Sequence, residues 1–234
     1  MPVIIGRPFK RFGNQYYKTI LADTPFAYWR LGETSGIVAN DELGTNDGTY
    51  VGSPTLGSAG AITGDADTAV LFNGTTDYME VPNIEVIPTT GDFSVEAWLK
   101  PASQSGSVYR GADGFGAGWS FNMFVGNTVA SNNLLLTVPG DVTVTVQLFQ
   151  TYSQTEFYHC VSVFKEGTGL YFYVNGVELG FSPSTSTTLR SSTRGMFLGV
   201  SNPIVPRNGY VDEVATYHYA LTPQQVLNHY NAGI

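Results

Sequence analysis

The stretch that decides the fold is Gly209-Tyr-Val-Asp-Glu-Val-Ala-Thr-Tyr-His-Tyr-Ala-Leu-Thr-Pro-Gln-Gln-Val-Leu-Asn-His-Tyr-Asn-Ala-Gly233, which lies just before the C-terminus. It predicts a strand, a turn and one short helix. Thr222 can cap that helix, Pro223 suits its first turn, and Gln225 stands where the partner in a capping box belongs. No other segment gives a comparable helical pattern, so the rest of the chain is predicted to fold as strands and loops.

The composition agrees with an all-β domain. The chain has 234 residues, of which 27 are glycine, 14 tyrosine and 14 phenylalanine, and only 13% are charged. Aromatic residues favour strands and glycines favour tight turns, so this mixture is typical of a protein made of short strands. A single domain of this length buries a large core, and the high aromatic content excludes a disordered chain.

Short apolar or alternating runs recur from Ile20 onward, with turn residues between them. The clearest is 142–149, where apolar side chains alternate with polar ones. The run 170–174 leads directly into Asn175-Gly176, a strong hairpin signal. So many short strands predict one antiparallel two-sheet jelly-roll sandwich over residues 21–234, with no second domain. The other predicted strands are 26–31, 69–72, 78–81, 93–100, 196–200 and 210–217.

Residues 1–20 show no sustained periodicity, and we predict that they form an extended N-terminal arm. Four of the eleven cations precede the first acidic residue, Asp23, which leaves seven cations against nineteen acids and a net charge of −12 for the remainder. The chain is therefore a basic arm on an acidic body. Such an arm either folds back on its own domain or docks on a neighbouring subunit, where rings anchor it and charges steer it. The residues expected to dock are Arg7, Phe9, Lys10, Arg11, Phe12, Tyr16, Tyr17 and Lys18.

Charge and hydropathy exclude several classes of partner. The net charge of −8 disfavours binding to nucleic-acid phosphates, and no apolar stretch reaches the length of a membrane span. The opening segment Met1–Arg7 does not resemble a signal peptide, because its apolar run is too short. We therefore expect no membrane insertion, and export only by a route that needs no signal peptide. The single cysteine, Cys160, excludes an internal disulfide framework, and its apolar neighbours predict a buried side chain.

Seven short motifs follow one another through the domain: Ala27-Tyr-Trp-Arg-Leu-Gly-Glu33, Asp41-Glu-Leu-Gly-Thr-Asn-Asp-Gly-Thr-Tyr50, Ala69-Val-Leu-Phe-Asn-Gly74, Phe93-Ser-Val-Glu-Ala-Trp-Leu-Lys100, Tyr173-Val-Asn-Gly176, Val211-Asp-Glu-Val-Ala215 and Ala220-Leu-Thr222. In this order they resemble the laminin G-like, or concanavalin A-like, jelly rolls, in the variant common in bacterial and bacteriophage proteins. The resemblance covers about residues 20–233 and leaves the arm outside. It implies two curved antiparallel sheets stacked face to face, with Trp29, Phe72, Trp98 and Tyr173 in the core.

The resemblance also implies a structural calcium ion. Family members often hold one with an early-loop carboxylate, backbone carbonyls and the aspartate of the late Asp-Glu-Val strand. The matching positions are Asp41 and Asp212, with Asn46 or Asp47 beside them. Calcium prefers six to eight oxygen ligands, which such a loop can offer. The alternative is that Asp41 forms an Asx-turn and Asp212 accepts hydrogen bonds from loop amides.

A glycan-binding surface is the second candidate site. Sugar recognition needs flat rings for the sugar faces and amides or carboxylates for the hydroxyls. The glycine-rich stretch 102–118 and the residues after it offer such groups, and so does the strand at 170–174 if its face is exposed. The alternative is that these rings pack on the sandwich or on a partner. The candidate residues are Tyr109, Phe115, Trp119, Asn122 and Tyr171.

Catalysis is the third candidate, and we predict that the chain is not an enzyme. Some relatives of this fold hydrolyse polysaccharides with two carboxylates on one strand. The corresponding strand, 93–100, offers only Glu96, and one acid cannot be both nucleophile and general acid. The histidines His159, His218 and His229 are scattered, without the spacing of a metal site or a nucleophile motif.

Two functional hypotheses follow. The first is a virion component, a phage capsid decoration or tail-associated protein that displays a lectin-like domain and is fixed by its arm. Its expected partners are other virion proteins, copies of itself in the assembly, and host or environmental glycans. The alternative is a bacterial carbohydrate-binding module, extracellular or on the cell surface, and a polysaccharide-active enzyme is a remote third reading. Fold alone does not decide between them.

Overall fold

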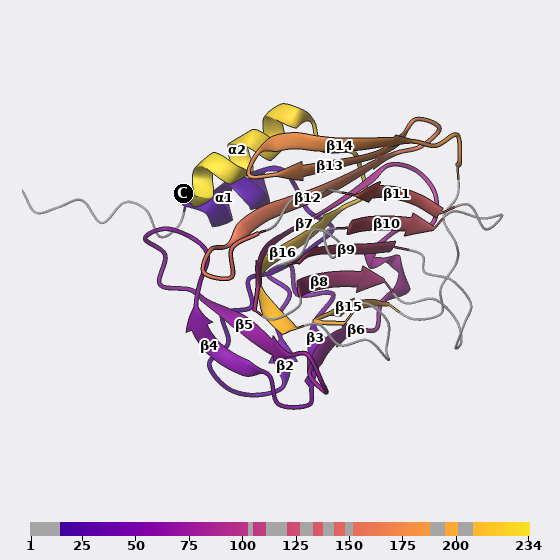
Figure 1. Ribbon diagram of the computed structural model, residues 1–234. Coiled ribbons are helices and arrows are strands. Elements are labelled where there is room, and N and C mark those ends of the chain that lie inside the picture. Colours follow the sequence, from indigo (N-terminus) through magenta and orange to yellow (C-terminus); the bar gives the residue numbers. More distant parts are fainter. Residues whose placement is uncertain are drawn as a thin grey trace, which may run out of the picture.

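The computed structural model describes residues 15–102, 105–110, 121–126, 133–137, 143–147, 152–187, 195–200 and 208–234. In these residues two antiparallel sheets are stacked face to face, which confirms the predicted sandwich (Figure 1). Sheet A runs in the order β14 (Val177–Pro183), β13 (Gly169–Val174), β12 (Tyr158–Lys165), β7 (Phe93–Pro101), β16 (Asn208–Tyr217), β5 (Thr68–Asn73) and β4 (Thr55–Ala59), and β1 (Ala27–Trp29) pairs with β16. Sheet B runs in the order β11 (Thr143–Gln147), β10 (Asn133–Thr137), β9 (Phe121–Gly126), β8 (Ser105–Arg110), β15 (Met196–Leu198), β6 (Tyr78–Val81), β3 (Gly48–Val51) and β2 (Val38–Ala39).

The chain crosses repeatedly between the two sheets, as expected for a jelly roll. Strand β6 of sheet B leads through a short 3-10 helix, η1 (Ile84–Val86), to β7 of sheet A. The predicted hairpin is also present: β13 and β14 pair through Val174 and Val177, and the two turn residues Asn175 and Gly176 have φ of 52° and 78°. Two successive positive φ values are the reason that Asn-Gly suits this turn.

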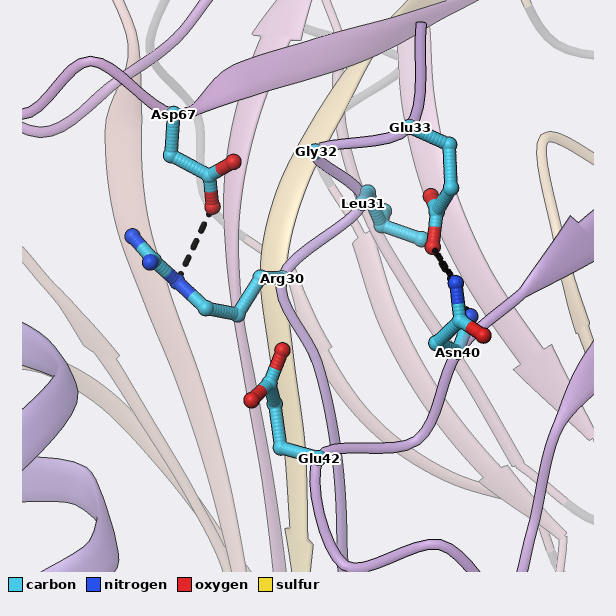
Figure 2. A pocket seen from close by; sticks show the side chains of 7 residues that line it. All are labelled: Arg30, Leu31, Gly32, Glu33, Asn40, Glu42 and Asp67. Atoms are coloured by element: carbon cyan, nitrogen blue, oxygen red, sulfur yellow. Dashed lines mark hydrogen bonds and ion pairs between the residues drawn. The ribbon is translucent and has the colours of Figure 1, made fainter. Parts of the chain in front are cut away.

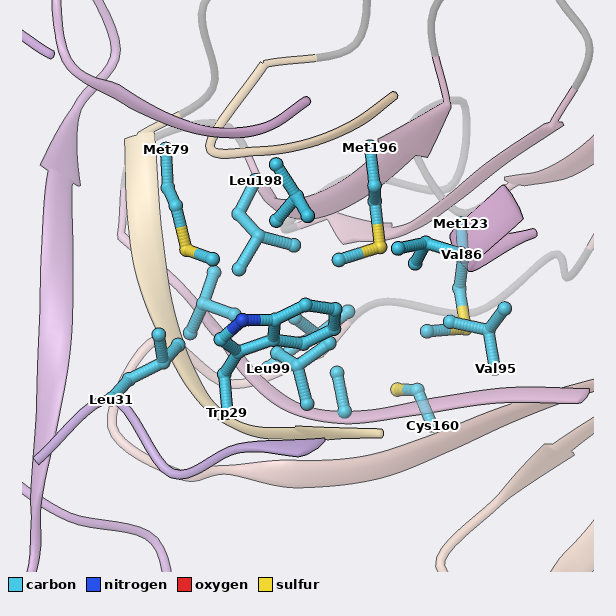
Figure 3. Close-up of a cluster of buried hydrophobic side chains, with 14 of the residues drawn as sticks. Trp29, Leu31, Met79, Val86, Val95, Leu99, Met123, Cys160, Met196 and Leu198 are labelled. Carbon is cyan, nitrogen blue, oxygen red and sulfur yellow. The ribbon is translucent and has the colours of Figure 1, made fainter. Parts of the chain in front are cut away.

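The main core lies between the sheets. Trp29 is fully buried there, and its indole Nε1–H donates a hydrogen bond to the Asn46 carbonyl at 2.9 Å. Phe72 belongs to the same cluster, and so does Cys160, whose buried thiol confirms the sequence prediction. Figure 3 shows how side chains from both sheets meet around the Trp29 indole; the labelled ones are Trp29, Leu31, Met79, Val86, Val95, Leu99, Met123, Cys160, Met196 and Leu198.

Trp98 and Tyr173 are buried in the core as predicted, but in a different layer from Trp29 and Phe72. Both belong to a second apolar cluster on the outer face of sheet A, beneath the helices. The strand period explains this result, because Trp98 alternates with Ala97 and Leu99, which face the main core. The domain therefore has apolar layers on both faces of sheet A.

Helix α2 (Pro223–Gly233) confirms the C-terminal prediction. The Thr222 hydroxyl accepts a hydrogen bond from the Gln225 amide at 3.2 Å, and the Gln225 side chain accepts one from the Thr222 amide at 2.9 Å. This reciprocal pair is a complete capping box.

Helix α1 (Gln15–Ala22) corrects the prediction of an extended arm through residue 20. Its residues Tyr16 and Ile20 are both fully buried, one turn apart on the face that contacts sheet A. Eight residues are too few for a recognisable period, and so short a helix depends on packing for its stability. Figure 1 shows α1 and α2 together on the outer side of sheet A. The predicted boundary between residues 20 and 21 therefore falls inside a structural element.

A buried polar network, here called the Glu96 cluster, joins the two helices to sheet A. His159 on β12 and His229 on α2 both contact Glu96 Oε2 on β7, at 2.9 Å and 3.0 Å. The other nitrogen of His229 lies 2.8 Å from Asp23 Oδ2, just after α1. The Tyr217 hydroxyl donates to the second Glu96 oxygen. His229 on α2 thus bridges Glu96 on sheet A and Asp23, which follows α1.

The pKa values in the Glu96 cluster follow from burial and charge. Burial lowers the pKa of His229, but Glu96 and Asp23 reverse this and raise it to about 9. Burial likewise opposes ionisation of Glu96, yet His229 and His159 hold the pKa of its carboxyl well below its usual range. Burial lowers the pKa of His159, which is therefore neutral near pH 7. The cluster is a buried ion pair between Glu96 and protonated His229.

Stability will fall as pH rises through the alkaline range. Because the pKa of His229 is raised on folding from about 6.5 to about 9, its contribution is complete below pH 6.5 and is lost as pH approaches 9. Linkage puts this contribution on the order of 3 kcal/mol. Urea unfolding at intervals from pH 6 to 9 measures it, and the His229→Gln variant is the comparison. The other groups that can titrate at alkaline pH, Cys160 and the tyrosines, are present in both proteins. If the free energy of unfolding changed with pH by the same amount in the wild type and in His229→Gln, a charged His229 would be contradicted.

Candidate functional site

A surface pocket of about 250 Å³ opens where three separate segments of the chain meet. It is here called the Arg30 pocket. The chain leaving β1, the loop between β2 and β3, and the residue before β5 each supply part of its wall (Figure 2). Its lining is mostly polar and consists of Arg30, Leu31, Gly32, Glu33, Asn40, Glu42 and Asp67.

Two strained backbone residues shape this pocket. Leu31 has φ of 63° and Glu213, at a bulge in β16, has φ of 51°. The Glu213 amide donates a hydrogen bond to the carbonyl of Arg30, the residue before Leu31, at 3.4 Å. A residue other than glycine in this region costs about 1–3 kcal/mol, and such residues concentrate at binding sites. Here the buried Leu31 side chain and the ion pairs of Glu213 hold the conformation.

The Arg30 guanidinium is held by three carboxylates. Its Nη2 lies 2.8 Å from Asp65 Oδ2 and 2.9 Å from Glu213 Oε1, and its Nε lies 2.9 Å from Asp67 Oδ2. The Tyr28 hydroxyl donates to the other Glu213 oxygen. Burial raises the pKa of Glu213 to about 7, although Arg30 opposes the shift. The cation is therefore fixed in position before any ligand arrives.

The other polar groups of the pocket are also oriented. Glu33 Oε1 accepts hydrogen bonds from the Asn40 amide at 2.8 Å and from the Asn40 side chain at 2.9 Å, and Glu33 Oε2 accepts one from the Tyr50 hydroxyl at 2.9 Å. Glu42 stands at the rim of the pocket, where partial desolvation by its neighbours raises the pKa of its carboxyl. Tyr17 of α1 interacts with Glu42, and its ring centroid lies 5.4 Å from the Arg30 guanidinium carbon.

The predicted calcium ligands accept hydrogen bonds from other groups of the protein. Asp41 accepts hydrogen bonds from four backbone amides, those of Tyr28, Leu43, Thr45 and Asn46, at 2.9–3.2 Å. Amide hydrogens directed at a carboxylate compete with a cation, so Asp41 does not fit a calcium ligand here. The contacts agree with the alternative given above, in which Asp41 forms an Asx-turn.

The remaining predicted ligands are also engaged in hydrogen bonds. Asp47 accepts from the Asp41 amide at 2.9 Å, Asn46 Oδ1 from Asn83 at 2.6 Å, and Asp212 Oδ2 from the Ala61 amide at 2.7 Å. Among the described residues no group of three or more His, Cys, Asp or Glu is arranged to hold a metal. Calcium binding by this chain stays a prediction.

The predicted glycan residues fall into separate places. Tyr109 on β8 pairs with Asn122 on β9 in the register of sheet B. Tyr171 lies on β13 of sheet A, with its ring centroid 4.5 Å from that of the exposed Phe181. The structure thus brings Tyr109 and Asn122 together and separates them from Tyr171. Phe115 and Trp119 lie outside the described residues.

The residues predicted to dock on a partner also lie in different places. Tyr16 is fully buried on the face of α1 that contacts sheet A, which agrees with the alternative that this part of the chain packs on its own domain. Tyr17 lies beside the Arg30 pocket, and Lys18 is exposed on α1. Arg7, Phe9, Lys10, Arg11 and Phe12 lie outside the part of the chain that the structure describes.

Sequence reasoning missed the Arg30 pocket. Residues 30–33 and Glu42 occur only within family motifs, and Asn40 and Asp67 belong to none of the motifs. No local pattern joins them, because the pocket exists only once β1, the β2–β3 loop and β5 are placed by the sheets. The one local signal is the pair of charged residues, Arg30 and Glu33, on either side of Leu31-Gly32, directly after an apolar strand.

The described residues include no helix with the length and apolar character needed to span a membrane.

Comparison with known proteins extends these observations. The sequence profile of the concanavalin A-like lectin/glucanases superfamily matches residues 73–227. The sialidase of Trypanosoma rangeli in complex with 2,3-difluorosialic acid is similar in structure, with a TM-score of 0.64 and 15% identity over 89% of this chain and 33% of that chain. The receptor-binding domain of botulinum neurotoxin C/D mosaic serotype gives a TM-score of 0.67 and 10% identity over 89% and 51%.

The binding domain of botulinum neurotoxin DC in complex with rat synaptotagmin II gives a TM-score of 0.64 and 11% identity over 91% of this chain and 52% of that chain. The chain thus spans from a third to about half of these structures. At such identities the likeness shows the fold alone. No curated protein sequence matches the chain at a significant level.

Proposed function

Because this chain belongs to the concanavalin A-like lectin/glucanase superfamily, we propose that it is a non-catalytic glycan-binding domain carried on a virion. The observation that carries the glycan part is the Arg30 pocket. It is open, polar and built of groups whose positions are fixed by other contacts. Carboxylates, an amide and a guanidinium are the groups that pair with sugar hydroxyls, and preorganised groups lose little entropy on binding.

Two features support a binding role over a catalytic one. Glycoside hydrolysis generally needs a pair of carboxyl groups on either side of the scissile bond. Glu96, the acid on the strand that carries such pairs in catalytic relatives, is fully buried and hydrogen-bonded to His159 and His229. In the Arg30 pocket, Glu33 accepts hydrogen bonds from Asn40, and Asp67 is ion-paired with Arg30. These two carboxylates are therefore better suited to orienting a bound ligand than to catalysing its hydrolysis.

The virion part of the proposal rests on charge. The segment before α1 contains Arg7, Lys10 and Arg11 and no acid, whereas the rest of the chain is strongly acidic. We assign this segment to attachment, to a capsid or tail subunit, with several copies in the assembly. The alternative, a free carbohydrate-binding module, keeps the sugar site and has no use for the basic segment.

Glycan-array screening followed by titration calorimetry with the best sugar tests the pocket. Asn40→Ala and Glu42→Ala remove exposed rim groups, and each will weaken binding roughly tenfold to a hundredfold, as expected for hydrogen bonds that involve charged groups. The exposed Glu156→Ala is the matched control and will bind like the wild type. Binding that survives both rim substitutions, or an array without any hit, would remove the proposal.

The attachment part is tested with a charge-reversal variant. A variant with Arg7, Lys10 and Arg11 all replaced by glutamate will melt like the wild type and bind sugar, but will not sediment with particles. Particle association that is unaffected by these three changes would favour the free module.

A further inference from the structure

We propose that the Arg30 pocket selects a sugar unit that carries a protonated amino group, such as glucosamine, over neutral and acidic sugars. The sugar ring in this inference rests on the proposed function. The preference for a cation is independent of it and follows from the carboxylates of the pocket and from the partners that these carboxylates have.

The lining of the Arg30 pocket carries a net negative charge. Of the seven described residues that line it, three are acids and one is a cation. The acids are Glu33, Glu42 and Asp67, and the cation is Arg30. A group with a positive charge is therefore attracted into the pocket, whereas a sugar with a carboxylate is repelled by three like charges.

The positive charge of Arg30 is already shared among carboxylates of the protein. Its Nη2 lies 2.8 Å from Asp65 Oδ2 and 2.9 Å from Glu213 Oε1, and its Nε lies 2.9 Å from Asp67 Oδ2. Figure 2 shows the guanidinium directed toward Asp67, with Glu42 on the other side of the Arg30 side chain. An acidic sugar would have to displace one of these carboxylates, so Arg30 does not make the pocket a site for anions.

Glu33 and Glu42 have a different set of partners. Both oxygens of Glu33 accept hydrogen bonds from neutral donors, the two nitrogens of Asn40 at 2.8 Å and 2.9 Å and the Tyr50 hydroxyl at 2.9 Å. Partial desolvation raises the pKa of the Glu42 carboxyl. In the described part of the chain, no lysine, arginine or histidine forms an ion pair with either acid. A partly desolvated carboxylate of this kind is stabilised when a cation approaches it.

The size of the pocket and the spacing of its acids favour an amine on a sugar over a bare ion. A volume of about 250 Å³ is close to the lower end of small-molecule sites, roughly 300 Å³, and suits one sugar unit. Among the described residues no three of His, Cys, Asp and Glu are arranged to hold a metal ion. An ammonium group donates three hydrogen bonds, and the neighbouring sugar hydroxyls suit the Asn40 side chain.

Chemical-shift titration of the nitrogen-15-labelled full chain with glucosamine, glucose and N-acetylglucosamine tests the preference, because these sugars differ only in the group on carbon 2. The side-chain amide of Asn40 reports binding in the pocket. At pH 6.5, where the amine is protonated, glucosamine will bind about tenfold to a hundredfold more tightly than the other two, as expected for a charge-assisted hydrogen bond. The difference will fall severalfold in 0.5 M salt, which screens exposed charges.

Glu42→Gln is the test variant, because it removes the charge and keeps the shape of an exposed side chain. Its affinity for glucosamine will fall about tenfold, toward that for glucose, and its affinity for glucose will stay close to that of the wild type. Glu156→Gln, equally exposed and outside the pocket lining, is the matched control and will keep the full preference. A preference for glucosamine that persists in Glu42→Gln would contradict the role of this carboxylate.

Two further probes separate this inference from the proposed function. Glucose or N-acetylglucosamine bound as tightly as glucosamine, or glucuronic acid bound more tightly, would overturn the inference and leave the proposed function standing. Ethanolamine carries an amine without a sugar ring. If it shifts the Asn40 signal and no sugar does, the proposed function fails while the preference for a cation stands. If neither ethanolamine nor any sugar shifts this signal, both fail.

Discussion

Replacing Glu96 with leucine will lower the free energy of unfolding by about 3–5 kcal/mol, the usual cost of removing one partner from a buried ion pair. The reason is the position of this carboxylate. It is fully buried and accepts from His159, His229 and Tyr217. Without it, protonated His229 keeps only Asp23, and two other buried donors lose their acceptor.

Urea unfolding at pH 7 measures this loss, and the exposed Glu156→Leu serves as the control, with an expected change within about 0.5 kcal/mol. The double variant Glu96→Leu/His229→Leu will recover part of the stability, because apolar residues can replace a whole buried pair at little cost. A single Glu96→Leu variant as stable as the wild type would show that the cluster contributes nothing to the fold.

Replacing Tyr16 with alanine will lower the free energy of unfolding by about 3 kcal/mol, as for other large buried rings. Tyr16 is fully buried, and its ring centroid lies 6.0 Å from that of Trp98 in an edge-on arrangement. Its loss leaves a cavity between α1 and sheet A. The exposed Lys18→Ala on the same helix is the matched control.

Thermal and urea melts of the two α1 variants give the comparison. Equal stability of Tyr16→Ala and Lys18→Ala would mean that α1 is not docked on the sheet.

The same reasoning determines how far the N-terminal segment can be deleted without damage to the domain. A deletion through residue 20 removes Tyr16 and Ile20 together, so it would damage the domain as well as the basic segment.

The sequence predicted those parts of the fold that local chemistry determines. The capping box at Thr222 and Gln225 and the hairpin turn at Asn175-Gly176 each depend on a few neighbouring atoms, and both are present. Alternation along the strands predicted the sandwich. Helix α1 was not predicted, because it is short and is stabilised by residues that lie far away in the chain.

The candidate site was much less predictable. Asp41 illustrates the reason: an acid in a turn rich in glycine and asparagine suits both a calcium site and an Asx-turn. Only the direction of the amide hydrogens of Thr45 and Asn46 distinguishes them. The Arg30 pocket depends on contacts between Arg30, Asp67 and Glu213, which are up to 183 positions apart. Spacing in the sequence carries no information of that kind.

The Glu96 cluster fastens the earliest described helix and the last helix of the chain at one point. Neither α1 nor α2 can be lost or lengthened without consequence for the other, since each covers apolar surface beside its neighbour. Helices α1 and α2 therefore form one structural unit on the outer face of sheet A. Over evolutionary time, insertions should therefore accumulate in the connections between strands and spare α1 and α2, whose contacting residues must change together.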